Sequence, residues 1–275
     1  MLNKVVFIQY RAVLLILLVL SLFGIVRVQA IQLSMEEIRW IGERVFEKEC
    51  ASRDESLIKW NEGEEFLSLG IGHFIWYPRG KKGPFEESFP EFLNYAKVSG
   101  EKIPAWLDTD LSSFCPWNSR EDFLDNQKDH RLLELREFLT ETKLLQAAFI
   151  VKRLEDALPL MLKNTPEENR GKIALQFNRV ASTLSGTYVL ADYVNFKGLG
   201  TTSYESYQGK GWGLLQVLSE MREADNESEP LREFSVAAKK ILEERVNNSP
   251  PERNEKKWLP GWQRRIDSYL KDNRN

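Results

Sequence analysis

Apolar residues recur at helical intervals through most of the chain. Ser34 stands three residues before Glu37, the spacing of a capping box, and apolar side chains follow at helical spacing. This pattern predicts a helix over Met35–Cys50. Beyond Asp129 the pattern is almost wholly helical, with a break near residues 140–142, an end at Pro159 and further helices over 166–184, 188–196, 213–221, 231–246 and 262–270.

A short stretch between these helical parts has a different pattern. Residues 66–77 are rich in β-forming side chains, and Gly63, Gly70 and Gly72 punctuate the region, so a small β-hairpin or two short strands are predicted. Residues 78–84 resemble a polar loop, residues 90–96 a short helix, residues 100–117 irregular chain and residues 247–251 a linker. The expected fold class is α+β, mainly helical. We expect one domain over residues 31–275, with a helix and a small β lobe (31–128) packed on a helical lobe (129–275).

The N-terminal thirty residues have the layout of a secretory signal peptide. Lys4 and Arg11 precede the uncharged apolar run 12–26, and Arg27 and the small-residue boundary at Ala30 follow it. We therefore expect cleavage after Ala30 and a secreted or periplasmic protein with no membrane span. An uncleaved membrane anchor is the alternative.

Composition narrows the possible chemistry. Removing residues 1–30 takes away three basic residues and no acidic ones, so the formal charge moves from −3 to −6. An acidic chain without a basic cluster is a poor nucleic-acid binder. Cys50 and Cys115 can form one disulfide or remain two buried thiols. With His73 and His130 they offer no metal-ligand spacing, so neither a metal nor another cofactor is expected.

Carboxylates gather around the predicted β region. Cleaving a glycosidic bond needs an acid to protonate the leaving oxygen and usually a second carboxylate. Glu49 lies at the predicted C-terminal end of the first helix, where exposed carbonyl groups should disfavour its ionised form and keep it protonated. Glu62, Glu64 and Glu65 are candidates for the second carboxylate.

Strand periodicity predicts which residues face a substrate. In an extended segment Phe66, Ser68, Gly70 and Gly72 project to one face, and the two glycines leave room for a polymer beside the Ser68 hydroxyl. His73 falls on the opposite, inward face. We interpret it as a hydrogen-bonded structural histidine.

The segment WNEGEEFLSLGIGH, residues 60–73, resembles the hairpin of phage-type lysozymes. The resemblance implies a lysozyme-like fold, with Glu49 as general acid, Glu62 as second catalytic carboxylate and Ser68 as the hydroxyl that positions water. Glu and Ser replace the family's Asp and Thr, and the preceding stretch is longer, which leaves Glu64 as an alternative to Glu62 and Glu55 as a rival acid. The stretch YVNFKG, residues 193–198, resembles a Phe-Asn-x-Gly element of the same family's helical lobe, which implies substrate binding by Asn195.

Aromatic side chains complete the expected substrate site. Trp60, Trp76, Trp106 and Trp117 lie near the predicted cleft, where rings can stack on sugars or pack in the core. We expect Glu64, Phe66, Gly70, Trp76 and Asn195 to contact substrate. The predicted function is a monomeric exported hydrolase of the β-1,4 glycan of peptidoglycan. The alternatives are a lytic transglycosylase using Glu49 alone, a chitin or chitosan hydrolase, and a non-catalytic wall-binding protein.

Overall fold

The computed structural model describes residues 31–83, 85–108, 114–222 and 229–271. It is mainly helical with a small antiparallel sheet, as the sequence predicts. The expected signal peptide, residues 1–30, lies outside these ranges. Among the helices within them, none has both the length and the hydrophobicity needed to cross a membrane.

Helix α2 (Met35–Cys50) is the helix predicted first, and its ends are fixed by local contacts. The Ser34 hydroxyl accepts a hydrogen bond from the Glu37 amide at 3.3 Å, and the Glu37 carboxylate accepts one from the Ser34 amide at 2.7 Å. At the other end Ala51 adopts a left-handed conformation with φ 50°, and its N–H donates to the Phe46 carbonyl. Glu49 therefore lies in the last turn, as expected.

Three short strands follow the helix. The turn η1 (Asp54–Leu57) leads into β1 (Ile58–Lys59), which pairs antiparallel with β2 (Leu67–Leu69), and β2 pairs with β3 (Phe74–Trp76). The hairpin of β2 and β3 is the predicted one, whereas β1 was not predicted. Helix α3 (Phe89–Val98) packs on the sheet through Phe92, whose ring stacks on Phe74 with 5.2 Å between centroids. Two short helices, α4 (Ala105–Asp108) and α5 (Arg120–Asp125), complete this part of the chain.

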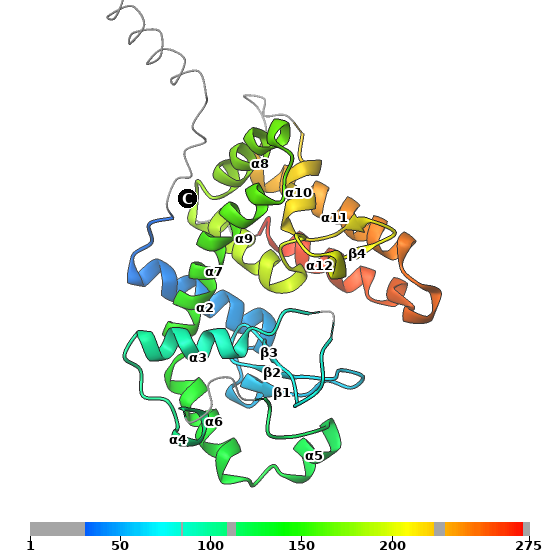
Figure 1. Cartoon of the computed structure of the whole chain (residues 1–275). Helices are drawn as coiled ribbons and strands as arrows, with labels where there is room; N and C mark the ends of the chain where they lie inside the picture. Colours follow the sequence, from blue (N-terminus) through cyan, green and yellow to red (C-terminus); the bar gives the residue numbers. More distant parts are fainter. Residues whose placement is uncertain (1–30, 84, 109–113, 223–228, 272–275) are drawn as a thin grey trace, which may run out of the picture.

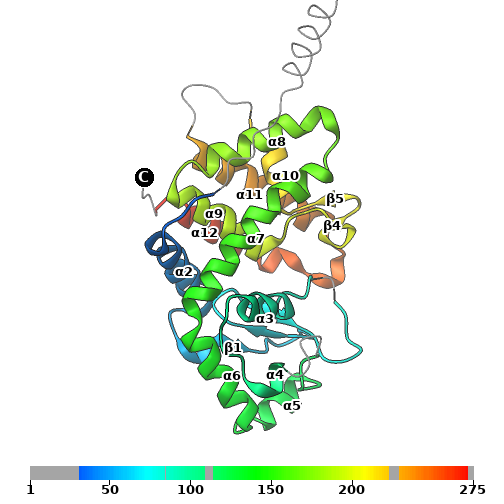
Figure 2. The ribbon, with the colours of Figure 1, turned by 60° about the vertical axis from the view of Figure 1, so that its left-hand side comes forward.

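Helix α7 (Lys143–Lys163) connects the two lobes. It follows α6 (His130–Glu141) after a break at Thr142, where the sequence predicted one. Figure 2 shows α7 running from the sheet lobe to the upper helices, and it contacts α2, α3, α8 and α9 along the way. Figure 1 places α6 in the same part of the molecule as the sheet, and Arg136 of α6 donates to the Glu55 carbonyl of η1 at 3.3 Å, so the lobe that holds the sheet includes α6.

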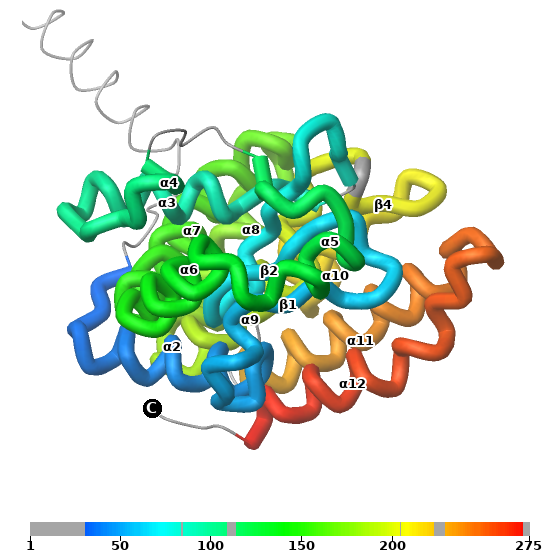
Figure 3. Tube along the Cα trace, turned by 90° about the horizontal axis from the view of Figure 1, so that it is seen from below, coloured from blue at the N-terminus to red at the C-terminus, as the bar shows by residue number. Residues whose placement is uncertain are grey.

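The second lobe consists of helices around α9 (Leu184–Lys197), which is buried along most of its length. Around it lie α8 (Glu167–Val180), α10 (Leu214–Glu220), α11 (Pro230–Asn248) and α12 (Leu259–Ser268). Helices α11 and α12 lie side by side (Figure 3). Strands β4 (Ser206–Tyr207) and β5 (Lys210–Gly211) form a second, unpredicted hairpin.

Three predicted boundaries in the second lobe are wrong. Helix α7 continues through Pro159 to Lys163, because the buried side chains of Leu158 and Met161 hold its last turn in the core. Helix α8 ends at Val180 rather than near residue 184, because Thr183 caps α9 through the Gly186 amide. The expected linker over residues 247–251 starts inside α11 and runs into η3 (Pro251–Arg253).

Candidate functional site

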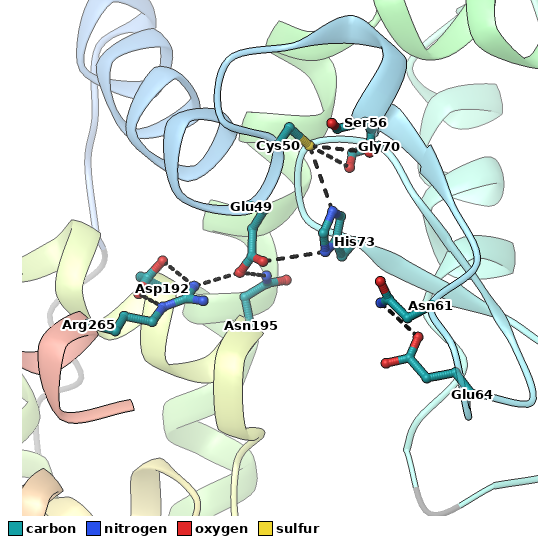
Figure 4. Close-up of polar contacts among 10 residues, drawn as sticks. All are labelled: Glu49, Cys50, Ser56, Asn61, Glu64, Gly70, His73, Asp192, Asn195 and Arg265. Carbon is teal, nitrogen blue, oxygen red and sulfur yellow. Dashed lines mark hydrogen bonds and ion pairs between the residues drawn. The ribbon is translucent and has the colours of Figure 1, made fainter. Parts of the chain in front are cut away.

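Glu49 is the centre of the site, at the junction of the two lobes. Its side chain is only 14% exposed. Arg265 of α12 donates from Nη2 to Oε1 at 2.5 Å, and Asn195 of α9 donates from Nδ2 to the same oxygen at 3.4 Å. On the other side, Nδ1 of His73 lies 3.4 Å from Oε2 (Figure 4). Side chains from both lobes therefore surround one carboxylate.

Arg265 is itself held by a fully buried acid. Asp192 accepts from Nε of Arg265 at 2.9 Å and from Nη2 at 2.7 Å, and it also accepts from the Tyr269 hydroxyl. The guanidinium carbon lies 4.4 Å from the ring centroid of Phe196. These contacts fix the cation from several directions, so its place beside Glu49 does not depend on Glu49 alone.

The expectation that Glu49 is kept protonated is wrong for this arrangement. Burial alone would raise the pKa of Glu49. The charge of Arg265, the charge that His73 carries when it is protonated, and the hydrogen bonds from Arg265 and Asn195 together outweigh burial, and the pKa lies below its ordinary value. The carbonyl groups at the end of α2 are only part of the surroundings of Glu49, because α12 brings a cation to the same carboxylate.

His73 and Cys50 complete the surroundings of Glu49. His73 has φ 48° in the turn between β2 and β3, so it does not lie on the inward strand face where the sequence placed it. Its Nε2 lies 3.8 Å from Sγ of Cys50. Burial lowers the pKa of His73, although Glu49 opposes this, which leaves the ring neutral at neutral pH.

The order Cys50, His73, Glu49 is not a nucleophilic triad. Cys50 is 1% exposed, and its thiol donates toward the carbonyls of Ser56 and Gly70. Burial, helped by the charge of Glu49, raises the pKa of this thiol to about 12. Cys50 is thus a packed thiol without nucleophilic character. Cys115 is also free and buried, so the disulfide is absent.

The loop between β1 and β2 presents Glu64 rather than Glu62. Glu62 lies exposed in a turn. Glu64 is partly buried, and its Oε2 accepts a hydrogen bond from Nδ2 of Asn61 at 2.9 Å. Figure 4 shows the Glu64 side chain pointing back toward the side on which Glu49 and Asn195 lie. Glu65 points to solvent, where Lys81 pairs with it at 2.8 Å.

The predicted open face of the hairpin is wrong. Strand β2 ends at Leu69, and Gly70 turns the chain with φ 70°. Ser68 is 3% exposed at the centre of the sheet. Gly72 packs against the ring of Phe74, so neither glycine leaves a free path for a polymer. The role of Ser68 in positioning water stays a prediction.

Gly70 instead makes room for a buried glutamine. Gln146 of α7 accepts from the Ile71 amide at 2.8 Å and donates to the Leu139 carbonyl at 2.7 Å, which fixes the turn that carries His73. A Cβ on Gly70 would lie 2.3 Å from Oε1 of Gln146.

Replacing Gly70 with alanine is therefore expected to lower the free energy of unfolding by about 2–4 kcal/mol, of which the left-handed backbone accounts for roughly 1–2 kcal/mol. Gly80→Ala is the matched control, because Gly80 has φ 75° and nothing within 4 Å of its Cβ position. Urea unfolding of both variants measures the difference. Equal losses of unfolding free energy in the two variants would show that Gln146 moves aside without destabilising the protein.

The aromatic residues expected to contact sugar are packed in the core. Trp76 is 1% exposed and lies against Phe89, with 4.9 Å between ring centroids. Phe66 is also buried, and its ring contacts Tyr77 and Phe85. Trp60 and Trp117 are buried as well, and the predicted substrate contacts of Phe66, Gly70 and Trp76 are thus corrected to packing contacts.

Three residues of the site were not predicted: Asp192, Arg265 and Tyr269. One signal for the first was available, because Asp192 is a lone acid inside the apolar run 188–194, and a carboxylate buried there needs a partner.

Within the described ranges, no group of three or more His, Cys, Asp or Glu side chains is arranged to hold a metal ion.

Comparison of the chain with protein-family models, with curated proteins and with solved structures found no match.

Proposed function

We propose that the chain is an exported glycoside hydrolase with a lysozyme-like fold that cleaves the β-1,4 glycan of peptidoglycan. The observation that carries the proposal is the environment of Glu49, a partly buried carboxylate at the end of α2 that receives contacts from both lobes. A glycosidase needs a carboxyl group whose protonation state is set by the groups around it, and a second carboxylate near that group.

Glu64 is the second carboxylate in this proposal. It is partly buried and oriented by Asn61, whereas Glu62 is exposed in a turn. Asn195 supports the proposal from the helical lobe, because the residue singled out by its resemblance to a lysozyme element lies within 3.4 Å of the Glu49 carboxylate. The protein acts as a monomer in the periplasm or outside the cell. Its partner is the wall polymer.

The test is to incubate the purified protein with isolated peptidoglycan sacculi and analyse the soluble fragments by mass spectrometry. Release of muropeptides with new reducing ends supports the hydrolase. Release of 1,6-anhydro ends would assign a lytic transglycosylase. Binding to sacculi without any released fragment would contradict the enzymatic function, and a parallel incubation with chitin and chitosan oligomers determines the polymer class.

A further inference from the structure

Helix α12 carries a line of side chains that leads to Glu49. Trp258 is the residue at the N-terminal end of the helix, Trp262 follows one turn later, and Arg265 follows one turn after that. Residues at this spacing lie on one face of a helix. Figure 3 shows α12 running beside α11 toward α2, and Arg265 near its C-terminal end donates to Glu49 of α2 at 2.5 Å.

The aromatic rings along this face are in contact with one another. The ring centroids of Trp258 and Trp262 lie 6.2 Å apart, and the centroid of Trp262 lies 6.5 Å from that of Phe196 on α9. The guanidinium carbon of Arg265 lies 4.4 Å from the ring centroid of Phe196. A path of neighbouring side chains therefore connects Trp258 with the Glu49 carboxylate.

Exposure to solvent decreases along this path. Trp258 is 47% exposed, Trp262 and Phe196 are partly buried, and the side chains of Arg265 and Glu49 keep only a small exposed fraction. The path is thus open to solvent at Trp258 and closes toward the junction of the two lobes, where binding sites commonly lie.

Two buried side chains hold the ring of Trp262 in place. Nζ of Lys197 lies 3.4 Å from the ring centroid, and the guanidinium carbon of Arg245 lies 4.9 Å from it. Arg245 is held in turn by the buried carboxylate of Glu255, which accepts from Nε at 2.7 Å and from Nη2 at 2.8 Å. A ring that is fixed before a ligand binds loses little conformational entropy when the ligand stacks on it.

The segment that carries Trp258 and Trp262 has the opposite charge to the whole chain. Residues 251–271 contain six Lys or Arg and three Asp or Glu, a formal charge of +3, whereas the whole chain has −3. Lys256 and Lys257 are exposed, and Nζ of Lys257 lies 4.9 Å from the ring centroid of Trp258. Exposed rings beside cations suit a ligand that presents sugar faces together with negative charges.

We propose that Trp258 and Trp262 form a binding surface for the peptidoglycan strand, along which the glycan extends away from Glu49. The proposal rests on the proposed function, because it assigns a place to the substrate of that same site. Sugar rings of the strand stack on the two tryptophans, and the carboxylates of its peptide stems lie near Lys256 and Lys257. Trp258 and Arg265 are about 10 Å apart along the helix, so a long strand at Glu49 reaches Trp258, whereas a single sugar does not.

Co-sedimentation with isolated sacculi tests the surface through binding alone. The background is Glu49→Gln, so that cleavage of the strand does not disturb the equilibrium. Adding Trp258→Ala is expected to raise the apparent Kd about tenfold, because the stacking platform is lost. Trp258→Phe keeps an aromatic face and should stay within about threefold of the background. Leu175→Ala is the matched control, because Leu175 is an apolar side chain on α8 that is 50% exposed, and it should bind like the background.

Cleavage kinetics give a second readout, which a merely structural role of Trp258 would not produce. In the protein with Glu49 intact, Trp258→Ala is expected to raise KM for sacculi about tenfold and to leave kcat within about twofold, because the ring holds the strand without touching the reacting bond.

The outcomes separate this binding surface from the proposed function. Undiminished binding of Trp258→Ala to sacculi, or an equal loss in Leu175→Ala, would overturn the surface even if the unaltered protein cleaves sacculi. Binding that depends on Trp258 without any cleavage would overturn the hydrolase and leave the surface in place. Trp258-dependent capture by phosphatidylglycerol vesicles, without binding to sacculi, would overturn the surface in favour of a membrane. Circular dichroism melting curves verify that each variant is folded.

Discussion

Replacing Glu49 with glutamine is expected to reduce the release of fragments from sacculi by about 100- to 10,000-fold, whichever proton-transfer role the residue has. Glutamine keeps the length of the side chain, and its carbonyl can still accept from Arg265 and Asn195. The substitution therefore removes the negative charge and the ability to take up or release a proton, with little change in packing. A reducing-end assay on isolated sacculi measures the effect.

Glu47→Gln is the matched control for this experiment. Glu47 lies on the same helix two residues before Glu49, but its side chain is 57% exposed. Among the ion pairs of the described residues, Glu47 forms one, with Arg44 at 3.7 Å. It is expected to retain the activity of the unaltered protein. If Glu49→Gln kept full activity while its melting temperature stayed unchanged, Glu49 would not belong to the catalytic machinery.

The part of the site on α2 was predictable because its signals are local. The Ser34 and Glu37 capping box and the apolar spacing of α2 are contained within a few turns of chain, and they place Glu49 in the last turn without reference to any other element. The β2 and β3 hairpin was predictable for the same reason. Its cross-strand partners, Leu67 with Trp76 and Leu69 with Phe74, are close in sequence.

The parts that were not predicted depend on distant contacts. Arg265 reaches Glu49 across 216 positions of sequence, and no spacing rule connects the two. Strand β1 has only two residues, so its pairing with Leu69 and Ser68 rather than any intrinsic preference makes it a strand. The face assignment failed at Gly70, because strand alternation was extended through a glycine whose left-handed conformation ends the strand.

Removing the Asp192 carboxylate is expected to cause the largest loss of stability among single substitutions around the site. Asp192 is fully buried and is the acceptor for two nitrogens of Arg265 and for the hydroxyl of Tyr269. In Asp192→Ala the guanidinium stays in a buried place with Glu49 as its remaining carboxylate. Breaking a buried ion pair from one side costs about 3–5 kcal/mol, and we expect the free energy of unfolding, measured by urea denaturation, to fall by that amount.

Asp267→Ala provides the comparison, because Asp267 lies on the same helix as Arg265 and pairs with Lys239 at the surface, with side chains 49% and 34% exposed. An exposed pair contributes about 0–1 kcal/mol, so this variant should unfold nearly like the unaltered protein.

Tyr269→Phe keeps the ring and removes the hydroxyl that donates to Asp192. Its free energy of unfolding should lie between those of Asp192→Ala and Asp267→Ala, with a loss of about 1.5–3 kcal/mol. If Asp192→Ala lowered the free energy of unfolding no more than Asp267→Ala does, Arg265 would have to be free to leave its place beside Glu49. A fixed cation could then no longer be the reason that Glu49 stays ionised.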